Sequence, residues 1–514
     1  MKTPLHSGFV GRSIATLEKR SHIKVIRAIL LLVLASIAVG CGSVQKRPNF
    51  VLIFCDDLGA FDLGCTGSER IHTPHIDALR TEGMLFKNAY SSASVCAPSR
   101  AALLTGLSLA HCQIRDNAEA PNLTDGTFGG QRPIDRGTET LGRALQRCGY
   151  RTGAFGKWGL GGVSASPDES IGHPLDSGFD RFYGILCQRN AHNAFASYVD
   201  SDRDKVALDG NSRSISGKQY VPDLCCNEAV KWINSCGSDA FFLYYATSLP
   251  HLALQAPQSA IDAYSFEEIP YDGKKGYLAH DRPRAAYAAM VWKIDEAVGR
   301  IVAELDAKGL RDNTLIILTS DNGATFELGG FDPKFFESNR GLRGWKGQLY
   351  EGGIRVPMIA SWPGHIAANS TCDIPVVGYD IFPTMLGIAN CATKNKSDGE
   401  NLAPLMFGEA SRAELAQRSP LVWEQPSGDG WQAVRDGDWK LIRRHAKKAT
   451  KAKFELYDLR VDPSESMNVA NAHPEVVERL ARVMSDRTES ALPDWNYASI
   501  TLPPMAQSES KSPR

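Results

Sequence analysis

Several short stretches of the chain are dominated by apolar residues and have the length of a β-strand. Residues 49–55, 240–246 and 314–320 are three such stretches. Strands in the middle of a parallel sheet are covered on both faces and read as nearly continuous apolar runs. We therefore expect these three stretches to be central strands. Two further strands are expected at 151–155 and 356–362.

Other stretches show the apolar period of a helix. Residues 284–305 show it most clearly, with apolar side chains recurring every three or four positions from Tyr287 onward. An apolar stripe of this kind indicates a helix that packs against a core, so this helix is interpreted as scaffold. Helices are also expected at 73–83, at 140–145 and from residue 380.

Beyond residue 397 the pattern changes to short strands separated by turns. The Asp436-Gly437 pair between two of these strands is a strong hairpin signal. This region is predicted to form a small antiparallel sheet with a helix at 474–484. The expected strands are residues 421–424, 431–435, 439–443 and 454–457.

The N-terminus has the pattern of a targeting segment. Basic residues precede the apolar run 28–40, which stops at Cys41 and is short for a membrane span. Residues 1–41 are therefore predicted to be a signal peptide, and its end resembles a bacterial lipobox. A lipid anchor at Cys41 predicts a protein of the bacterial periplasm or cell surface. Cleavage and release is the alternative, because Ala38 stands where leucine is usual.

Composition and charge narrow the class of protein. The chain has 514 residues, of which 43% are hydrophobic and 22% charged, as in ordinary globular proteins. This length favours one large domain and a smaller one. The net charge of −1 gives no electrostatic footprint for nucleic acid, so no nucleic-acid partner is expected. Residues 503–514 are polar and predict a flexible tail.

The chain contains 12 cysteines, which in an exported protein favours disulfides. Cys225, Cys226 and Cys236 form one group of candidates, and Cys372 with Cys391 forms another. Spacing alone does not give the connectivity.

Two of the predicted central strands end in acidic residues. Asp56 and Asp57 follow the first strand, and Asp321 with Asn322 follows the strand at 314–320. Ligands of open α/β sheets gather at the carboxyl ends of strands, so the fold can bring these side chains together. Three carboxylates and an amide oxygen suit Ca²⁺ or Mg²⁺ far better than zinc. An exposed acidic turn is the structural alternative.

The most unusual local sequence is Cys96-Ala97-Pro98-Ser99-Arg100, which precedes a short apolar helix. Pro98 suits the first helical position, which places Cys96 at the mouth of the helix, where free N–H groups and the dipole favour anions. Arg100 lies one turn further and can turn its cation back to the same point. A buried structural cysteine is the alternative interpretation.

With Cys96, Pro98 and Arg100 in this order, the stretch resembles the signature of the type I, formylglycine-dependent sulfatases of the alkaline phosphatase superfamily. The resemblance extends over residues 48–468. It implies an alkaline-phosphatase-like α/β sandwich, with a large central mostly parallel or mixed sheet and a smaller C-terminal antiparallel α/β subdomain. The implied domains are residues 48–395 and 396–490.

The resemblance also implies that a formylglycine-generating or sulfatase-maturing enzyme oxidises Cys96 to formylglycine. A hydrated aldehyde carries two hydroxyls on one carbon. One hydroxyl attacks sulfur, and deprotonation of the other then expels the sulfate by C–O cleavage. A plain serine would keep the sulfate as an ester.

Further motifs of the family follow in the family's order. Lys157 lies in Gly156-Lys157-Trp158, His251 follows Pro250, and Lys346 follows Trp345. The resemblance implies that both lysines bind the sulfate and that Arg100 steadies the nucleophile. His251 would protonate the leaving alcohol, because an imidazole gains and loses a proton near physiological pH. Calcium is the expected ion, with Mg²⁺ as the alternative, and residue 96 is expected to touch it.

One position departs from the family pattern. Sulfatases usually carry histidine where this chain has Gly159. His192 is a candidate replacement, because related sulfatases with glycine here have a similar stretch around it. An ordinary loop histidine is the alternative.

The predicted activity is hydrolysis of a sulfate ester on a sulfated polysaccharide or oligosaccharide. Specificity is expected from the loops 188–211 and 326–340. Trp345, Trp423 and Trp431 offer faces for sugar rings, although core packing is the commoner role of tryptophan. Two alternatives remain open at this point. One is a phosphonate or phosphate monoester hydrolase on the same fold, and the other is a lipoprotein that binds sulfated glycans without catalysis.

Overall fold

The computed structural model describes Met1, Glu414 and residues 47–117, 119–121, 128–161, 172–212, 214–409 and 417–500. Apart from Met1, the predicted signal peptide (1–41) with its lipobox-like end and the predicted tail (503–514) lie outside these residues. From Pro48 onward the chain forms one compact unit. Within the part of the chain that the structure describes, no helix is both long and apolar enough to cross a membrane.

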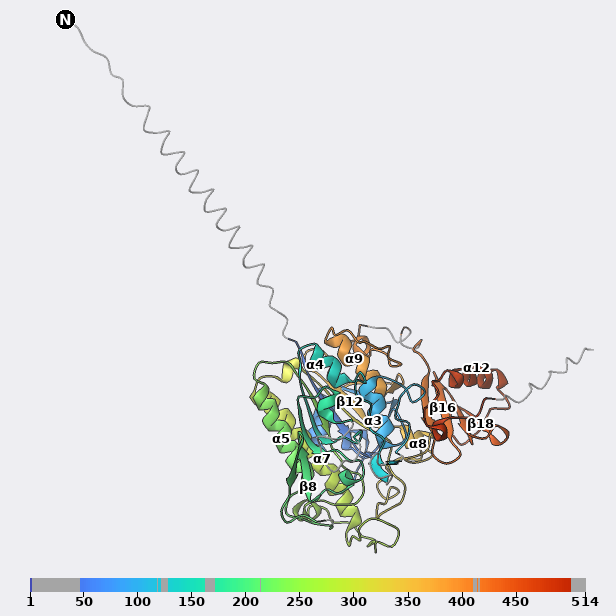
Figure 1. The fold of residues 1–514 in the computed structure, drawn as a ribbon, viewed down its shortest axis with the longest axis horizontal. Coiled ribbons are helices and arrows are strands. Elements are labelled where there is room, and N and C mark those ends of the chain that lie inside the picture. The colour runs from blue at the N-terminus through green and yellow to red at the C-terminus, as the bar shows by residue number, and fades with distance from the viewer. Residues whose placement is uncertain are drawn as a thin grey trace, which may run out of the picture. The chain divides into compact units, whose positions relative to one another are not determined.

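A ten-stranded mixed sheet forms the centre of this unit (Figure 1). Its strand order is β13-β2-β12-β11-β1-β10-β6-β7-β8-β9, and the five strands from β11 to β7 run parallel to one another. The five strands predicted from the sequence are confirmed as β1, β6, β10, β11 and β12. The strands of the sheet are β1 (Asn49–Cys55), β2 (Met84–Phe86), β6 (Arg151–Lys157), β7 (Arg181–Ile185), β8 (Tyr198–Ser201), β9 (Asp204–Ala207), β10 (Phe241–Ala246), β11 (Thr314–Ser320), β12 (Met358–Ser361) and β13 (Ser370–Cys372).

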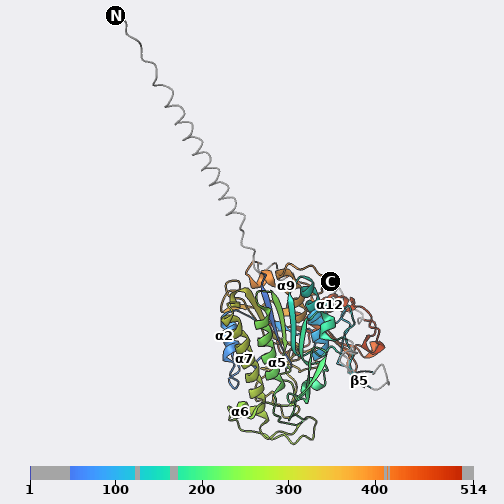
Figure 2. The ribbon, with the colours of Figure 1, turned by 60° about the vertical axis from the view of Figure 1, so that its left-hand side comes forward.

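Helices cover both faces of this sheet, with α5 and α7 on one side and α3, α4 and α9 on the other (Figures 1 and 2). Successive residues of a strand point to opposite faces, so Val51 and Ile53 belong to one core and Phe50 and Leu52 to the other. The helices are α2 (Pro74–Thr81), α3 (Cys96–Thr105), α4 (Leu141–Arg147), α5 (Val221–Cys236), α6 (Gln258–Ile261), α7 (Pro283–Ala307), α8 (Glu351–Ile354), α9 (Ile381–Ile388) and α10 (Ala403–Met406).

The predicted C-terminal sheet is confirmed as a four-stranded antiparallel sheet with one helix against it (Figure 1). One face of this sheet packs on the main body through the fully buried Trp423, which is therefore a core residue. The other face packs on the helix. The elements are β15 (Leu421–Gln425), β16 (Trp431–Asp436), β17 (Trp439–Arg444), β18 (Lys453–Asp458) and α12 (Pro474–Ser485). Two small ladders complete the fold, β3 (Ala89–Tyr90) with β14 (Val376–Val377) and β4 (Glu119–Pro121) with β5 (Phe128–Gln131).

The disulfide candidates were only partly right. Cys391 pairs with Cys148, across 243 residues of chain. Cys225, Cys226 and Cys236 form no disulfide, and all three lie on the single helix α5. Positions 225 and 236 of a helix are about 16 Å apart, far beyond the reach of a disulfide.

The stretch 188–211 is more ordered than a loop. Its second half forms β8 and β9, which extend the main sheet at its edge. The stretch 326–340 contains no helix or strand, as predicted.

Candidate active site

The acidic residues at the strand ends meet as the sequence predicts. Strands β1 and β11 are parallel neighbours, and their ends are in register. Asp57 and Asp321 are 264 residues apart, yet the backbone N–H of Asp57 donates to Asp321 Oδ1 at 3.1 Å. The side chain of Asn322 donates to Asp57 Oδ1 at 2.7 Å. The parallel pairing of two strands thus creates the site.

Asp57 turns the chain so that both aspartates of the pair face the site. In a continued strand Asp56 and Asp57 would point to opposite faces of the sheet. Asp57 instead has a φ of 67°, a left-handed conformation that aspartate tolerates better than most residues. Both carboxylates are buried as a result.

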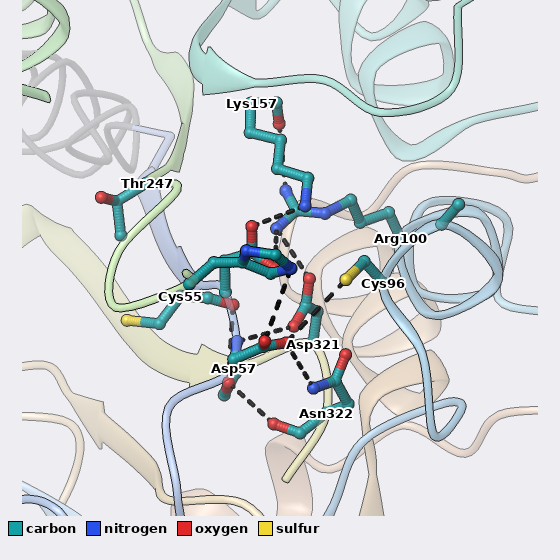
Figure 3. A network of polar contacts seen from close by, with 12 residues as sticks. Cys55, Asp57, Cys96, Arg100, Lys157, Thr247, Asp321 and Asn322 are labelled. Carbon is teal, nitrogen blue, oxygen red and sulfur yellow. Dashed lines mark hydrogen bonds and ion pairs between the residues drawn. The ribbon is translucent and has the colours of Figure 1, made fainter. Parts of the chain in front are cut away.

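Cys96 lies at the N-terminus of α3, beside these carboxylates (Figure 3). The helix begins at Cys96 itself, so the expectation that Pro98 takes the first helical position is off by two residues. A proline fits there because the N–H groups of the first turn lack partners within the helix. The Sγ atom of Cys96 lies 3.9 Å from Asp57 Oδ1 and 3.2 Å from Lys346 Nζ. The cysteine has no exposed surface.

Three cations surround the carboxylates. Two of these cations, Arg100 and Lys157, are labelled in Figure 3, and the third is Lys346. Lys157 pairs with Asp56 at 2.5 Å and Lys346 with Asp57 at 2.6 Å. Arg100 pairs with Asp321 at 2.8 Å and lies 3.8 Å from Asp56 Oδ1. Arg100 comes from the first turns of α3 and Lys157 from the end of β6. The site therefore concentrates positive charge around the cysteine.

Burial and these charges shift the pKa values of the acidic groups. Burial alone would raise the pKa of Asp56, but Lys157, His251 and Arg100 hold it well below its usual value. Burial and the neighbouring Asp56 raise the pKa of Asp321 to about 7. Burial and the same aspartates raise the pKa of the Cys96 thiol to about 12. In this environment an unmodified Cys96 is a protonated thiol at neutral pH and a poor nucleophile.

Two histidines lie at one end of the site. His251 follows β10, and its Nε2 is 3.5 Å from Asp57 Oδ2, while its Nδ1 is 2.5 Å from the carbonyl of Leu252. The ring of His192 stacks on that of His251, with 3.7 Å between centroids. The Nε2 atom of His192 lies 3.4 Å from Lys157 Nζ. Burial and neighbouring positive groups lower the pKa of both, that of His251 to about 4.

The predicted site residues are thus brought together in one place, including His192. The roles assigned to them stay predictions. One neighbour, Gln188, was not singled out from the sequence as a functional residue. A β-carbon on Gly159 would lie 2.6 Å from the Oε1 atom of Gln188. No motif marks this glutamine, so only the fold reveals it.

The donor set of the site fits a divalent metal ion. Asp56 Oδ1 and Asn322 Oδ1 are buried oxygens without a hydrogen-bond partner in the described residues. Ligand atoms of Asp56, Asp57, Cys96 and His251 lie within 4.8 Å of one another. Buried carboxylate and amide oxygens are ligands for a hard cation.

Two cavities are lined by residues of the site or by their neighbours in the chain. One, of about 380 Å³, is lined by His192, Tyr198 and Tyr277 among others. The other, of about 550 Å³, is lined by Trp345, next to Lys346 in the chain, and by Lys334 and Arg340 of the stretch 326–340.

Known proteins resemble this chain along most of its length. Residues 48–391 match the Sulfatase family, and residues 341–490 match the N-sulphoglucosamine sulphohydrolase C-terminal family. Human (Homo sapiens) arylsulfatase A is 31% identical, over 89% of this chain and 90% of the relative. N-acetylgalactosamine-6-O-sulfatase of Bacteroides thetaiotaomicron is 27% identical, over 86% and 93%. The crystal structure of Ps i-CgsB in complex with k-i-k-neocarrahexaose superimposes with a TM-score of 0.71, at 26% identity, over 88% of this chain and 96% of the other.

The fold and the site define an enzyme of the alkaline-phosphatase-like α/β class. Within that class the chain belongs to the sulfatase family, and it is a sulfuric ester hydrolase. The predictions of family, fold class and enzyme activity are confirmed.

Proposed function

We propose that this sulfatase removes sulfate from a sulfated carbohydrate and that residue 96 is its nucleophile after conversion to formylglycine. The observation that carries the proposal is the placement of Cys96 Sγ, which lies beside Lys346 Nζ and Asp57 at the N-terminus of a helix. Arg100, Lys157 and Lys346 surround the same point. A formylglycine-generating or sulfatase-maturing enzyme is the partner that this proposal requires.

A calcium ion, with Mg²⁺ as the alternative, is the proposed metal. Asp56, Asp57, Asp321 and Asn322 would hold it together with residue 96. The three carboxylates are already paired with three cations. The positive charge of a bound ion would therefore be available to attract the negative sulfate. When bound, the ion supplies electrostatic stabilisation of charge that develops on the sulfate oxygens.

The side chains around this point divide the remaining work. Lys157 and Lys346 are placed to bind sulfate oxygens through their ammonium groups. His251 presents Nε2 to the site, since its Nδ1 is bound to the Leu252 carbonyl. Because Nδ1–H donates to that carbonyl, Nε2 carries a proton only in the imidazolium form of the ring, and in that form it can protonate the oxygen of the leaving alcohol. His192 is the proposed base for the step that releases sulfate.

The carbohydrate part of the proposal rests on the two cavities and on the relatives. Tyr277 lines the first cavity and Trp345 the second, and aromatic faces bind sugar rings. Lys334 and Arg340 outnumber Glu337 among the charged residues that line the second cavity, and a net positive lining suits an anionic neighbouring sugar. The bacterial relative is named for a sulfated galactosamine and the superimposed crystal structure holds a neocarrahexaose.

The test is a panel of sulfated mono- and oligosaccharides that differ in the position of the sulfate. We expect release of sulfate from at least one sugar by the protein from its native host, and loss of this activity in Cys96→Ala. Peptide mass spectrometry should find an aldehyde at residue 96. Activity on phosphonate esters with none on sulfate esters would overturn the proposal, as would an active enzyme with an intact thiol.

The proposed location is the bacterial periplasm or cell surface, with a lipid anchor at Cys41. The basic and apolar pattern of residues 1–41 supports export, and the Cys148–Cys391 disulfide is typical of an oxidising compartment. Cys41→Ala should release the protein from the membrane fraction without changing sulfatase activity. Unchanged membrane association of that variant would exclude an anchor at Cys41.

A further inference from the structure

The space that the family's histidine would occupy is filled in this protein by another side chain. Gly159 has a φ of 71°, and a β-carbon added there would lie 2.6 Å from Gln188 Oε1 and 3.3 Å from Arg100 Cδ. A histidine at this position would therefore collide with the glutamine. Glycine at 159 leaves the room that the end of the Gln188 side chain takes up.

The backbone fixes this arrangement. The chain after β7 runs beside the chain after β6, because Trp158 N donates to Ile185 O at 3.0 Å and Gly159 N donates to Leu186 O at 3.2 Å. These bonds hold the residue two positions after Leu186, Gln188, against Gly159, which Arg100 also borders. The side chain is buried, with only 7% of its surface exposed.

The carboxamide of Gln188 is chemically unsatisfied. Among the described residues neither its Nε2 nor its Oε1 has a hydrogen-bond partner, and the same holds for Nε of the adjacent Arg100. Leaving a buried amide without hydrogen bonds costs stability. Such a group in an active site is typical of a side chain that serves a ligand.

We infer that Gln188 is a catalytic residue that takes the place of the missing histidine: its carboxamide binds the sulfate group and the hydroxyl at residue 96 during turnover. This rests on the proposed function of residue 96. The amide N–H donates to a sulfate oxygen, and the amide oxygen accepts from the hydroxyl. An amide does not take up a proton at ordinary pH, so Gln188 binds and orients while the proton passes to His192.

The test compares Gln188→Met with the control Gln432→Met. Methionine has a similar length and no strong hydrogen-bonding group. Gln432 is also buried, but its side chain donates to Glu424 at 3.0 Å and accepts from Arg443 at 2.9 Å. Three quantities are measured for both variants: the melting temperature, kcat, and the affinity for inorganic sulfate by calorimetry with Ca²⁺ present.

Gln188→Met should melt at the same or a higher temperature than the parent, because it removes a polar group without a partner. Its kcat should fall about 10²–10³-fold, the usual effect of losing one hydrogen-bond donor to the transition state. Its affinity for sulfate should fall as well. Gln432→Met should show the reverse, a lower melting temperature with unchanged kcat and sulfate affinity.

A lower melting temperature of Gln188→Met with unchanged kcat and sulfate affinity would overturn the inference and make Gln188 a structural residue. Failure of the proposed function is a separate outcome, seen as no turnover of sulfated sugars by the parent enzyme. In that case the sulfate affinities of parent and variant still decide whether Gln188 binds the anion.

Discussion

His192 and His251 share one end of the active site although they come from different parts of the chain. Their rings stack with 3.7 Å between centroids, and Lys157 Nζ lies 3.4 Å from His192. Two imidazolium ions face to face beside an ammonium group would repel one another. At most one of the two rings is therefore expected to carry a proton charge at a time, which suits a pair that exchanges protons in turn.

Replacement of His192 by alanine should slow turnover by about 10²–10⁴-fold, the usual contribution of a general base. Alcohol release in the first turnover should be little affected, so a stopped-flow assay should show a burst followed by slow steady state. His251→Ala should behave differently and slow the release of poor leaving alcohols more than that of activated aryl alcohols.

The control for these variants is His365→Ala, because this histidine is exposed and packs on Trp362. It should leave turnover unchanged. Normal turnover of His192→Ala without a burst would assign His192 to substrate recognition or to no role.

The sequence predicted the charged residues of the site because each lies in a recognisable local context. Asp56 and Asp57 follow a buried strand, and Cys96 lies in a signature with a fixed order of residues. Gln188 could not be found in this way. The role proposed for it depends on the absence of a β-carbon at Gly159 and on the approach of Gln188 to that glycine from the chain after another strand of the sheet. Local pattern does not encode that contact.

At the scale of elements, the site depends on the register of two strands. β1 and β11 pair from Asn49 with Thr314 to Cys55 with Ser320, and the residues that follow both ends are the proposed metal ligands. A shift of register would separate Asp57 from Asp321. The site is therefore as rigid as the centre of the sheet, which suits an enzyme that must hold several charges in fixed positions.

Removal of the metal should abolish activity and lower stability. Without a dication, the buried Asp56 Oδ1 and Asn322 Oδ1 are left without hydrogen-bond partners among the described residues. Binding of an ion to the folded state alone raises stability by mass action. We expect a strong chelator to inactivate the enzyme and to lower its melting temperature. Ca²⁺, or alternatively Mg²⁺, should restore both. Recovery with Zn²⁺ alone would contradict the proposed ligand chemistry.

The elements themselves were predictable to different degrees. The central strands were found because burial on both faces leaves a continuous apolar run, as in β1 and β11. Strand β8 and the edge strand β9 were missed because they are short, and β9 is exposed along its whole length. Such strands have no apolar pattern to detect, and only pairing with a neighbour defines them.

At the scale of the whole molecule, a buried cluster of charges joins the C-terminal sheet to the main body. Lys440 of β17 contacts Glu351 of α8 at 2.9 Å and Glu465 at 2.8 Å. Burial and the charge of Glu351 raise the pKa of Glu465 to about 7, although Lys440 opposes this. Burial would also raise the pKa of Glu351, but Lys440 and two arginines lower it to about 2.

These shifts predict a dependence of stability on pH. A glutamate in the unfolded chain ionises near pH 4.5, whereas folded Glu465 holds its proton to about pH 7. Ionisation therefore favours the unfolded chain in this window, and stability falls as the pH rises through it. The lowered pKa of Glu351 means that its ionised form stabilises the folded protein. This stabilisation is lost only as the pH falls from about 4.5 toward 2.

Glu465→Gln removes the ionisation of this residue and should remove its share of the pH dependence. Between about pH 5 and pH 8, the free energy of unfolding of the parent should fall relative to the variant by up to about 3 kcal/mol. Urea denaturation at several pH values measures this difference. The exposed Glu475→Gln is the control and should run parallel to the parent. If the free energy of unfolding of Glu465→Gln runs parallel to that of the parent across this pH range, an abnormal ionisation of Glu465 is excluded.

The complete burial of Cys96 has a consequence for the order of events in the life of the protein. The sulfate group of a substrate is small and can enter where Lys346 is partly exposed. Another enzyme cannot close its own active site around a residue with no exposed surface. The maturation proposed for Cys96 must therefore happen while the chain is still unfolded. Each molecule has one opportunity to become active, and a copy that folds first stays inactive for as long as it remains folded.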